Sequence, residues 1–484
     1  MSDKKPKIRG LSQILTFFRK NTTPIFFVSP TAFNLLGVEK FVNRFYHINY
    51  FDSFDGFHPR VFVPREAGVR DFESMEEVCN YLLSHKEVID RIRKSGGGPA
   101  KLLFVMFDEE TEELAKELGV EIAHPSAALR SRLDSKIETT RLANEAGIAS
   151  APNVLGRADS FESLMTQAEK AGLGGDLVVQ TPYGDSGRTT FFIKGREDWD
   201  KNADDMVDEH LKIMKRINHM PGTLEACVTR RGTLVGPVQT DITGFAEITP
   251  YKGGWCGNDA NPRIFNQRVR RDLRQMAQAL GDRLYQEGYK GVFCMDFLID
   301  TDDGTPYLGE INPRISGASP LTNLVTATYG GAPLFLFHLL EYLDVDYEID
   351  LRKMQRRWLE FDIWSQLILK QTEDKVQLLT GAPTTGVWHM NKDGAIEFGR
   401  RELDWTNVID NDEAYYLRVY REGDYLFKGA DLGIVVARGR MQTDRRELRE
   451  RAKLWTAGIK AQFEGVPPPE PPAVEPHPLS SKLY

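Results

Sequence analysis

The sequence predicts a mixed α/β and α+β protein built from more than one domain. Strand and helix patterns alternate through the first 125 residues, two β-rich strands form a hairpin over residues 291–312, and a less regular mixture follows residue 345. Alternating strands and helices are typical of a small, mostly parallel sheet, whereas a hairpin requires antiparallel strands. A chain of 484 residues is long enough for two to four such domains.

The composition argues against several functional classes. Hydrophobic residues make up 41% of the chain, and the net charge of −8 argues against a general nucleic-acid or anionic-membrane surface. The four cysteines are scattered without a Cys-x-x-Cys pair, so neither a zinc site nor a disulfide framework is expected. No apolar run approaches the length of a membrane span, and the N-terminus lacks the pattern of a signal peptide. We therefore expect a cytoplasmic protein with no nucleic-acid or membrane partner.

Residues 1–125 are expected to form an N-terminal α/β domain. Helices are predicted over residues 75–93 and 109–118, and Gly119 is a stop signal for the second. No Gly-x-Gly-x-x-Gly motif follows a strand here, so the fingerprint of dinucleotide binding is absent. The strands of this domain are expected at residues 24–29, 46–51, 61–63 and 101–107.

Two features in the middle of the chain suit anions. Asp134 or Ser135 could cap a helix, which places Lys136 at a helix start, where backbone N–H groups favour anions. Strands are expected at residues 176–180 and 191–193. The loop between them carries small, flexible residues whose backbone N–H groups could contact phosphates: Gly184, Asp185, Ser186, Gly187 and Arg188.

Residues 243–259 mix glycine, aromatic and polar residues without a period, which suits a substrate loop and a purely structural loop about equally. The candidate substrate residues there are Lys252, Trp255, Asn258 and Asp259.

An amphipathic helix is expected over residues 268–288. Beyond residue 345, strands are expected at residues 358–369, 386–390, 415–419 and 432–440, and a helix at residues 443–463.

The hairpin carries the strongest chemical signal. Strand alternation places its aromatic and methionine side chains on one face and Asp296 on the other. On the return strand, Glu310 and Asn312 lie two residues apart and therefore share a face. These three side chains can converge as hard oxygen ligands, which suit Mg²⁺. Arg314 fits beside them when a phosphate or another oxyanion lies between the guanidinium and the ion.

Asp296, Glu310, Asn312 and Arg314 match, one by one, a signature of the ATP-grasp superfamily, and the chain resembles that superfamily well over residues 125–345. The resemblance implies an ATP-grasp fold that uses ATP and Mg²⁺, with Mn²⁺ as an alternative ion. Arg314 would be the catalytic residue. The implied domains are a Rossmann-like pre-ATP-grasp domain (1–125), the ATP-grasp domain (126–345) with a mobile phosphate loop (181–190), and a C-terminal α+β lid (346–465). The proline-rich composition of residues 466–484 predicts a disordered tail.

The resemblance also assigns nucleotide contacts. Lys136 would reach an ATP phosphate, and Gly184, Ser186, Gly187 and Arg188 would form the phosphate loop. One departure concerns Gln180, which stands where the family commonly has a lysine, so that Arg188 would have to supply the missing charge. The adenine contacts carried over from the family are Glu225, Ala226 and Val228.

Within the superfamily, the chain is similar to the biotin-carboxylase-like branch. Ser316, Gly317 and Ala318 stand where biotin carboxylase has the Gln-Val-Glu run that handles bicarbonate, and no biotinyl segment is present. The Arg-x-Ser-Gly run that includes Ser316 and Gly317 instead resembles amino-acid and peptide ligases, which makes these two residues substrate candidates.

The favoured function is therefore an ATP-dependent carboxylate–amine ligase that forms an amide or peptide bond through an acyl phosphate and releases ADP and phosphate. Its partners would be a small carboxylate and an amine, amino acids or a peptide among them, and a homodimer stays open. Two alternatives remain. One is a bicarbonate-using enzyme of the biotin carboxylase type. The other is a non-catalytic ATP-binding sensor, which is motivated by Gln180.

Overall fold

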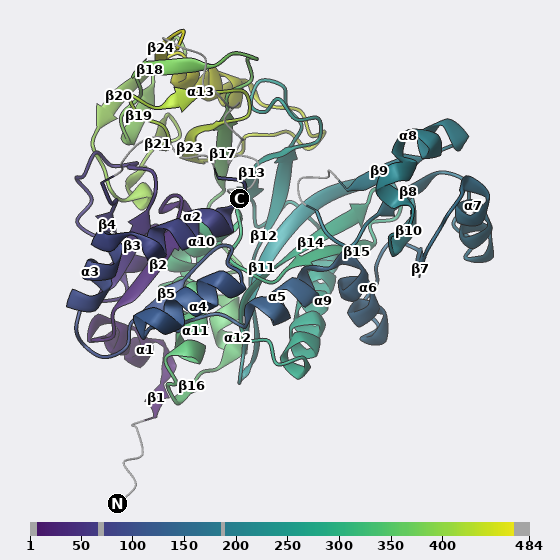
Figure 1. Cartoon of the computed structure of the whole chain (residues 1–484), viewed down its shortest axis with the longest axis horizontal. Coiled ribbons are helices and arrows are strands. Elements are labelled where there is room, and N and C mark those ends of the chain that lie inside the picture. Colours follow the sequence, from purple (N-terminus) through teal and green to yellow (C-terminus); the bar gives the residue numbers. More distant parts are fainter. Residues whose placement is uncertain (1–6, 66–71, 185–188, 469–484) are drawn as a thin grey trace, which may run out of the picture.

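The computed structural model describes residues 7–65, 72–184 and 189–468, and these ranges form three main sheets with helices packed around them (Figure 1). A ten-stranded antiparallel sheet is flanked by a five-stranded parallel sheet and a four-stranded antiparallel sheet. Phosphate-loop residues Ser186, Gly187 and Arg188, and most of the Pro-rich tail, lie outside the described residues. Within the described part of the chain, no helix is long and apolar enough to cross a membrane.

The N-terminal part confirms the predicted parallel layer. One face of its sheet packs against α2, α3 and α4, and the other packs against α1 and α11. The order along the sheet is β4 (Val61–Phe62), β3 (Phe45–Asn49), β2 (Ile25–Ser29), β5 (Lys101–Leu103) and β6 (Glu121–Ile122). The helices are α1 (Gly10–Arg19), α2 (Met75–Ser84), α3 (Lys86–Lys94), α4 (Glu109–Leu118) and α11 (Phe335–Tyr342).

One helix prediction in this part was wrong. Residues 75–93 form two helices, α2 and α3, because His85 adopts an extended backbone between them. The His85 ring nitrogen Nδ1 accepts a hydrogen bond from the Glu87 backbone and so caps α3. Helix α4 matches its predicted bounds, and Gly119 ends it in the left-handed conformation.

The four-stranded sheet forms a small unit that projects to one side of the molecule (Figure 1). Its outer face packs against α7 (Phe161–Lys170) and α8 (Arg196–Met206) through a core that includes Leu177, Val179 and Ile213. The strands run in the order β7 (Asn153–Gly156), β10 (Leu211–Lys215), β8 (Leu177–Gln180) and β9 (Thr190–Ile193). Helices α5 (Ala127–Asp134) and α6 (Lys136–Glu145) precede this unit.

The ten-stranded sheet begins at the predicted hairpin. Helix α9 (Gln267–Gln286) covers one face of this end, where it packs against Phe293, Met295 and Phe297, so the predicted alternation is confirmed. Asp296 lies on the opposite face. The first five strands are β15 (Pro306–Asn312), β14 (Gly291–Asp300), β11 (His219–Thr229), β12 (Gly232–Thr243) and β13 (Trp255–Ala260).

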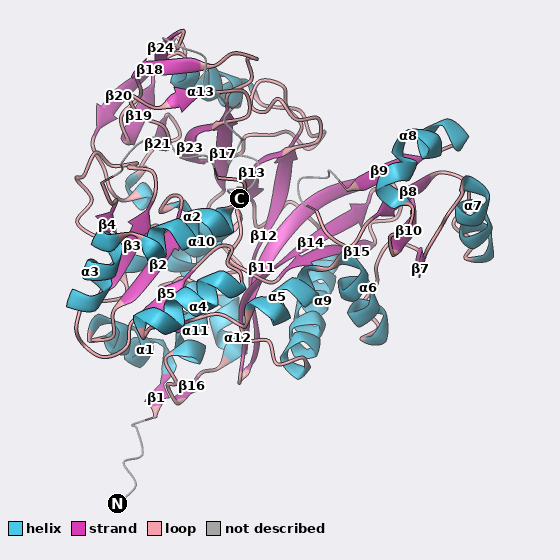
Figure 2. Cartoon of the chain, in the orientation of Figure 1, coloured by secondary structure: helices cyan, strands magenta, loops and turns pink. Residues whose placement is uncertain are grey.

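The C-terminal segment continues the same sheet, because β13 pairs with β17 (Figure 2). The remaining strands are β17 (Trp364–Lys370), β23 (Asp431–Arg438), β21 (Glu413–Arg418), β19 (Gly386–Met390) and β20 (Ile396–Arg400). The expected strand at residues 358–369 starts only at Trp364, and the expected helix at 443–463 is confined to α13 (Glu450–Lys460).

Candidate active site

A cavity of about 940 Å³ lies on the face of the large sheet that carries Asp296. Its wall includes side chains from the N-terminal part, such as Asp108, and from the C-terminal segment, such as Lys370. Most of the predicted site residues line it together: Lys136, Gly184, Lys252, Trp255, Asn258, Asp296, Glu310, Asn312, Arg314, Ser316 and Gly317. Residues scattered over 180 positions of the sequence therefore meet at one opening.

The hairpin brings its polar groups into contact. Asp296 lies directly opposite Glu310 in the register, and Gly309 bulges out of the ladder just before it. The Asn312 amide Nδ2 donates to Asp296 Oδ2 at 3.0 Å, and Arg314 Nη2 donates to Asn312 Oδ1 at 2.9 Å. The convergence of these four side chains, which the sequence predicted, is present in the structure.

The protein leaves two polar groups at this point in unfavourable surroundings. Burial and the nearby charge of Glu310 raise the pKa of Asp296 to about 6. A hydrogen bond of 2.7 Å, donated by Thr223 Oγ1, acts in the opposite direction and lowers this pKa. Arg314 Nε is buried, and no hydrogen-bond partner for it exists among the described residues. The site thus holds two facing carboxylates beside an unsatisfied guanidinium N–H, which suits a cation and an oxyanion bound side by side.

The donor set fits Mg²⁺ better than a softer metal. The described residues contain no group of three His, Cys, Asp or Glu side chains that could hold an ion. Asp296 and Glu310 supply two carboxylates, and Asn312 supplies an amide oxygen. Mg²⁺ is often held by one or two carboxylates together with water and phosphate oxygens.

Lys136 links the helix α6 start to this hairpin. It is the first residue of α6, and Ser135 caps the helix by accepting a hydrogen bond from a backbone N–H. The Lys136 ammonium lies 3.2 Å from Glu310 Oε2 and donates to the Gly184 carbonyl at 2.5 Å. The lysine therefore contacts both the Glu310 carboxylate and Gly184, which belongs to the predicted phosphate loop.

The predicted adenine contacts were wrong. Glu225, Ala226 and Val228 lie on β11 in the middle of the large sheet, where the last two pack into the core under α9. Glu225 is only 2% exposed and accepts hydrogen bonds from the Ser316 and Ser319 hydroxyls. The chain crosses from the small sheet to the large one earlier, between β10 and β11, without a glycine or proline to mark the crossing.

Asp259 was also wrongly predicted as a substrate residue. It alternates with Asn258 along β13 and points away from the cavity. Its carboxylate accepts hydrogen bonds from the Met441 N–H at 2.9 Å, the Gln442 N–H at 3.2 Å and the Ser365 hydroxyl at 2.5 Å. Asp259 therefore fastens the C-terminal segment to the sheet.

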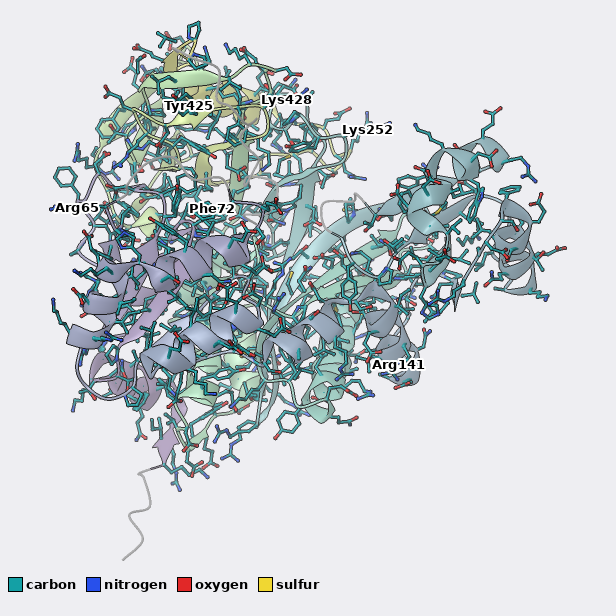
Figure 3. All side chains as sticks on the ribbon, viewed as in Figure 1. Arg65, Phe72, Arg141, Lys252, Tyr425 and Lys428 are labelled. Atoms are coloured by element: carbon teal, nitrogen blue, oxygen red, sulfur yellow. The ribbon has the colours of Figure 1, made fainter. Side chains whose placement is uncertain are left out.

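The other predicted substrate residues meet at the cavity. Lys252 lies on the loop between β12 and β13, beside the C-terminal segment (Figure 3). Gly317 lies under the Trp255 indole, because a Cβ atom built there would come within 2.5 Å of the ring. Only a glycine leaves room for this contact.

Two cavity residues on neighbouring strands escaped the sequence analysis. Thr223 and Asp241 continue the polar row that starts at Glu310 and Asp296. Burial and the charge of Asp296 raise the pKa of Asp241 to about 8, and Asn258 Nδ2 donates to its carboxyl at 2.8 Å. The sequence signal is a period-two run of polar residues along β12: Gln239, Asp241 and Thr243.

Comparison with curated protein sequences gives a partial match. No protein-family model matches the chain. The butirosin acyl-carrier-protein–L-glutamate ligase of Niallia circulans is 24% identical over 268 residues, which cover 52% of this chain and 61% of that protein. The match thus spans about 61% of the length of this curated relative.

Solved structures match nearly the whole chain. Campylobacter jejuni biotin carboxylase, in an ATP complex, has a TM-score of 0.61 with 12% identity, covering 92% of each chain. An Aspergillus clavatus N5-carboxyaminoimidazole synthase with bound ADP has a TM-score of 0.55 with 14% identity, covering 91% of this chain and 99% of that one. Phosphoribosylamine–glycine ligase of Thermotoga maritima has a TM-score of 0.57 with 11% identity, covering 92% of this chain and 97% of that one. At these identities the likeness establishes the fold.

The buried position of Glu225 yields a stability prediction. Burial raises its pKa to about 7, so the folded state holds a proton that the unfolded state releases near pH 4.5. Wild-type stability should fall as pH rises from 4.5 to 7, and Glu225→Gln should escape this loss. We expect the variant to gain about 1–3 kcal/mol in the free energy of unfolding at pH 8, and less than half of that at pH 5.

Urea unfolding of both proteins at the two pH values measures this difference. A Glu225→Gln protein that unfolds like wild type at pH 8, or that gains as much stability at pH 5 as at pH 8, would contradict the structural role.

Proposed function

We propose that this chain, which has the ATP-grasp fold, is an ATP-dependent carboxylate–amine ligase that forms an amide or peptide bond and releases ADP and phosphate. The observation that carries the proposal is the buried Arg314 Nε without a partner among the described residues, next to the paired carboxylates Asp296 and Glu310. An enzyme that makes an acyl phosphate beside a cation needs this combination of charges.

Asp296, Glu310 and Asn312 would hold the Mg²⁺, with Mn²⁺ as the alternative ion. When bound, the ion supplies charge neutralisation at the β- and γ-phosphates. The Lys136 ammonium would exchange part of its contact with Glu310 for a phosphate oxygen, since it already lies between Glu310 and Gly184 of the phosphate loop. The buried position of Lys136 would help to exclude water, which would otherwise hydrolyse an acyl phosphate.

Arg314 would act in both chemical steps. In the first, a carboxylate oxygen of the substrate bonds to the γ-phosphorus and the bond to ADP breaks. In the second, the amine nitrogen bonds to the carbonyl carbon, phosphate leaves, and the nitrogen loses a proton. Negative charge develops near Arg314 in each step, and its free N–H would stabilise that charge.

The substrates would occupy the part of the cavity beyond the hairpin. Trp255, Lys252 and Asn258 line that part, with Asp241 beneath it. A carboxyl such as Asp241 offers a partner to an ammonium or amine. The relative from Niallia circulans is named for joining L-glutamate to a carrier protein, so amino acids are the first candidates to test.

A bicarbonate-using reaction is less well supported. Ser316 donates its hydroxyl hydrogen bond to Glu225, and Gly317 has no side chain. Neither of these residues can act as a base on bicarbonate. The absence of a base at these two positions therefore supports a carboxylate–amine ligase over an enzyme that uses bicarbonate.

Substitutions at the hairpin test the site. Glu310→Gln and Arg314→Ala should each lower turnover at least a hundredfold, because each removes charge that the reaction requires. Asp302→Asn, an exposed change in the turn of the same hairpin, is the matched control and should retain full activity. Circular dichroism checks the fold, and a correctly folded Glu310→Gln or Arg314→Ala protein with wild-type turnover would refute the site.

Product analysis tests the reaction class. Purified protein with Mg-ATP should release ADP and phosphate only when a carboxylate and an amine are both present. The panel should combine amino acids, small acids and an acyl-carrier protein. AMP release would exclude the acyl-phosphate route, turnover with bicarbonate and free biotin would favour a carboxylase, and tight ATP binding without turnover on any pair would favour a sensor.

A further inference from the structure

Lys212 is a buried cation that the sequence analysis did not single out. It lies on β10 in the small sheet and is 1% exposed. Its ammonium donates to the Gly309 carbonyl at 3.1 Å, at the bulge just before Glu310. Burial lowers the pKa of Lys212 to about 8. The negative charge of Glu310 acts in the opposite direction, and the positive charge of Lys136 lowers the pKa further.

The strand register shows which way Lys212 faces. Lys212 lies directly opposite Gln180 on β8, and Gln180 lies opposite Thr190 on β9. Residues directly opposite one another in antiparallel strands share a face, so the three side chains form one row. The neighbours Val179 and Ile213 point the other way, into the core under α7 and α8. The row therefore faces the hairpin.

Gln180 adds no positive charge to this row. Its amide nitrogen donates to the Thr190 hydroxyl at 3.1 Å, and it carries no charge. Cβ atoms of directly opposite residues lie about 5 Å apart. A lysine side chain is long enough to bridge such a distance, so an ammonium that starts from position 212 can reach the space in front of position 180.

The present partner of Lys212 matches its charge poorly. A backbone carbonyl is neutral, whereas a buried ammonium is stabilised best by an anion. Lys136 lies beside the next residue of the same strand, 3.2 Å from Glu310 Oε2. Two lysines from two different elements thus contact Gly309 and Glu310, which is a suitable arrangement for a polyanion that bridges the two ammonium groups.

We propose that Lys212 binds a phosphate oxygen of the nucleotide and supplies, from the adjacent strand, the positive charge that Gln180 lacks. On nucleotide binding, the ammonium exchanges the Gly309 carbonyl for the phosphate. The proposal rests on the nucleotide-binding part of the proposed function and is independent of the ligase reaction. It also removes the need for Arg188 to compensate for Gln180.

A charge-relocation experiment tests this assignment. Binding of Mg-ATP, Mg-ADP and adenosine is measured by titration calorimetry for wild type, Lys212→Gln, Gln180→Lys and the double variant Lys212→Gln/Gln180→Lys. We expect Lys212→Gln to weaken ATP and ADP binding at least tenfold and adenosine binding less than twofold. The double variant, which moves the lysine across one strand pair, should recover most of the loss. Gln180→Lys alone should change ATP affinity less than threefold, because the row already holds one charge.

Adenosine is the internal control for folding, because it reports on the base site without phosphates. Unchanged ATP affinity in Lys212→Gln, an equal loss for adenosine and ATP, or a loss that Gln180→Lys does not reduce would each overturn the proposal. Wild-type protein that binds none of the three nucleotide ligands would instead overturn the proposed function, and this inference with it.

Discussion

The structure depends on two carboxylates that face each other across one strand pair. Asp296 and Glu310 are directly opposite in the β14–β15 ladder, and like charges in that position repel. Burial makes the repulsion costlier, as the raised pKa of Asp296 indicates. The surroundings supply compensation from separate elements: Lys136 from a helix start and Arg314 from the segment after the strand. Such strain is typical of a site completed by its ligands.

Each of the three sheets positions different groups around this pair of carboxylates. The large sheet fixes the carboxylates and the polar row toward Asp241, because its strands are continuous on both sides of β14. The small sheet brings Lys212 and Gln180 to the hairpin from outside. The N-terminal part closes one wall through residues such as Asp108, the cap of α4, although it supplies none of the proposed metal ligands. The proposed metal ligands and the wall that borders the cavity therefore come from different elements.

The sequence predicted the groups whose position follows from local periodicity. Asp296, Glu310 and Asn312 were placed correctly because alternation within two adjacent strands decides which residues share a face. Glu225 was misplaced because its strand is buried inside the sheet, and only the pairing of distant strands reveals this. Lys212 was missed for a similar reason, since its relation to Gln180 exists only in the register of β8 and β10. Non-local pairing leaves no mark in a single stretch of sequence.

The pairing of β13 with β17 has a mechanical consequence. Backbone hydrogen bonds run without a break from the hairpin edge to the last C-terminal strand, and the Asp259 carboxylate adds a side-chain fastening. The C-terminal segment thus belongs to the same sheet as the hairpin. A hinge motion between the two would have to break the backbone hydrogen bonds between β13 and β17. The four-stranded unit, by contrast, shares no sheet with the rest of the described chain. It is joined to it by the segments around residues 149–152 and 216–218, by the backbone hydrogen bond from Lys136 to Pro182, and by side-chain contacts such as that of Lys212. The projecting unit could therefore rotate against the rest without breaking the strand pairing of any sheet.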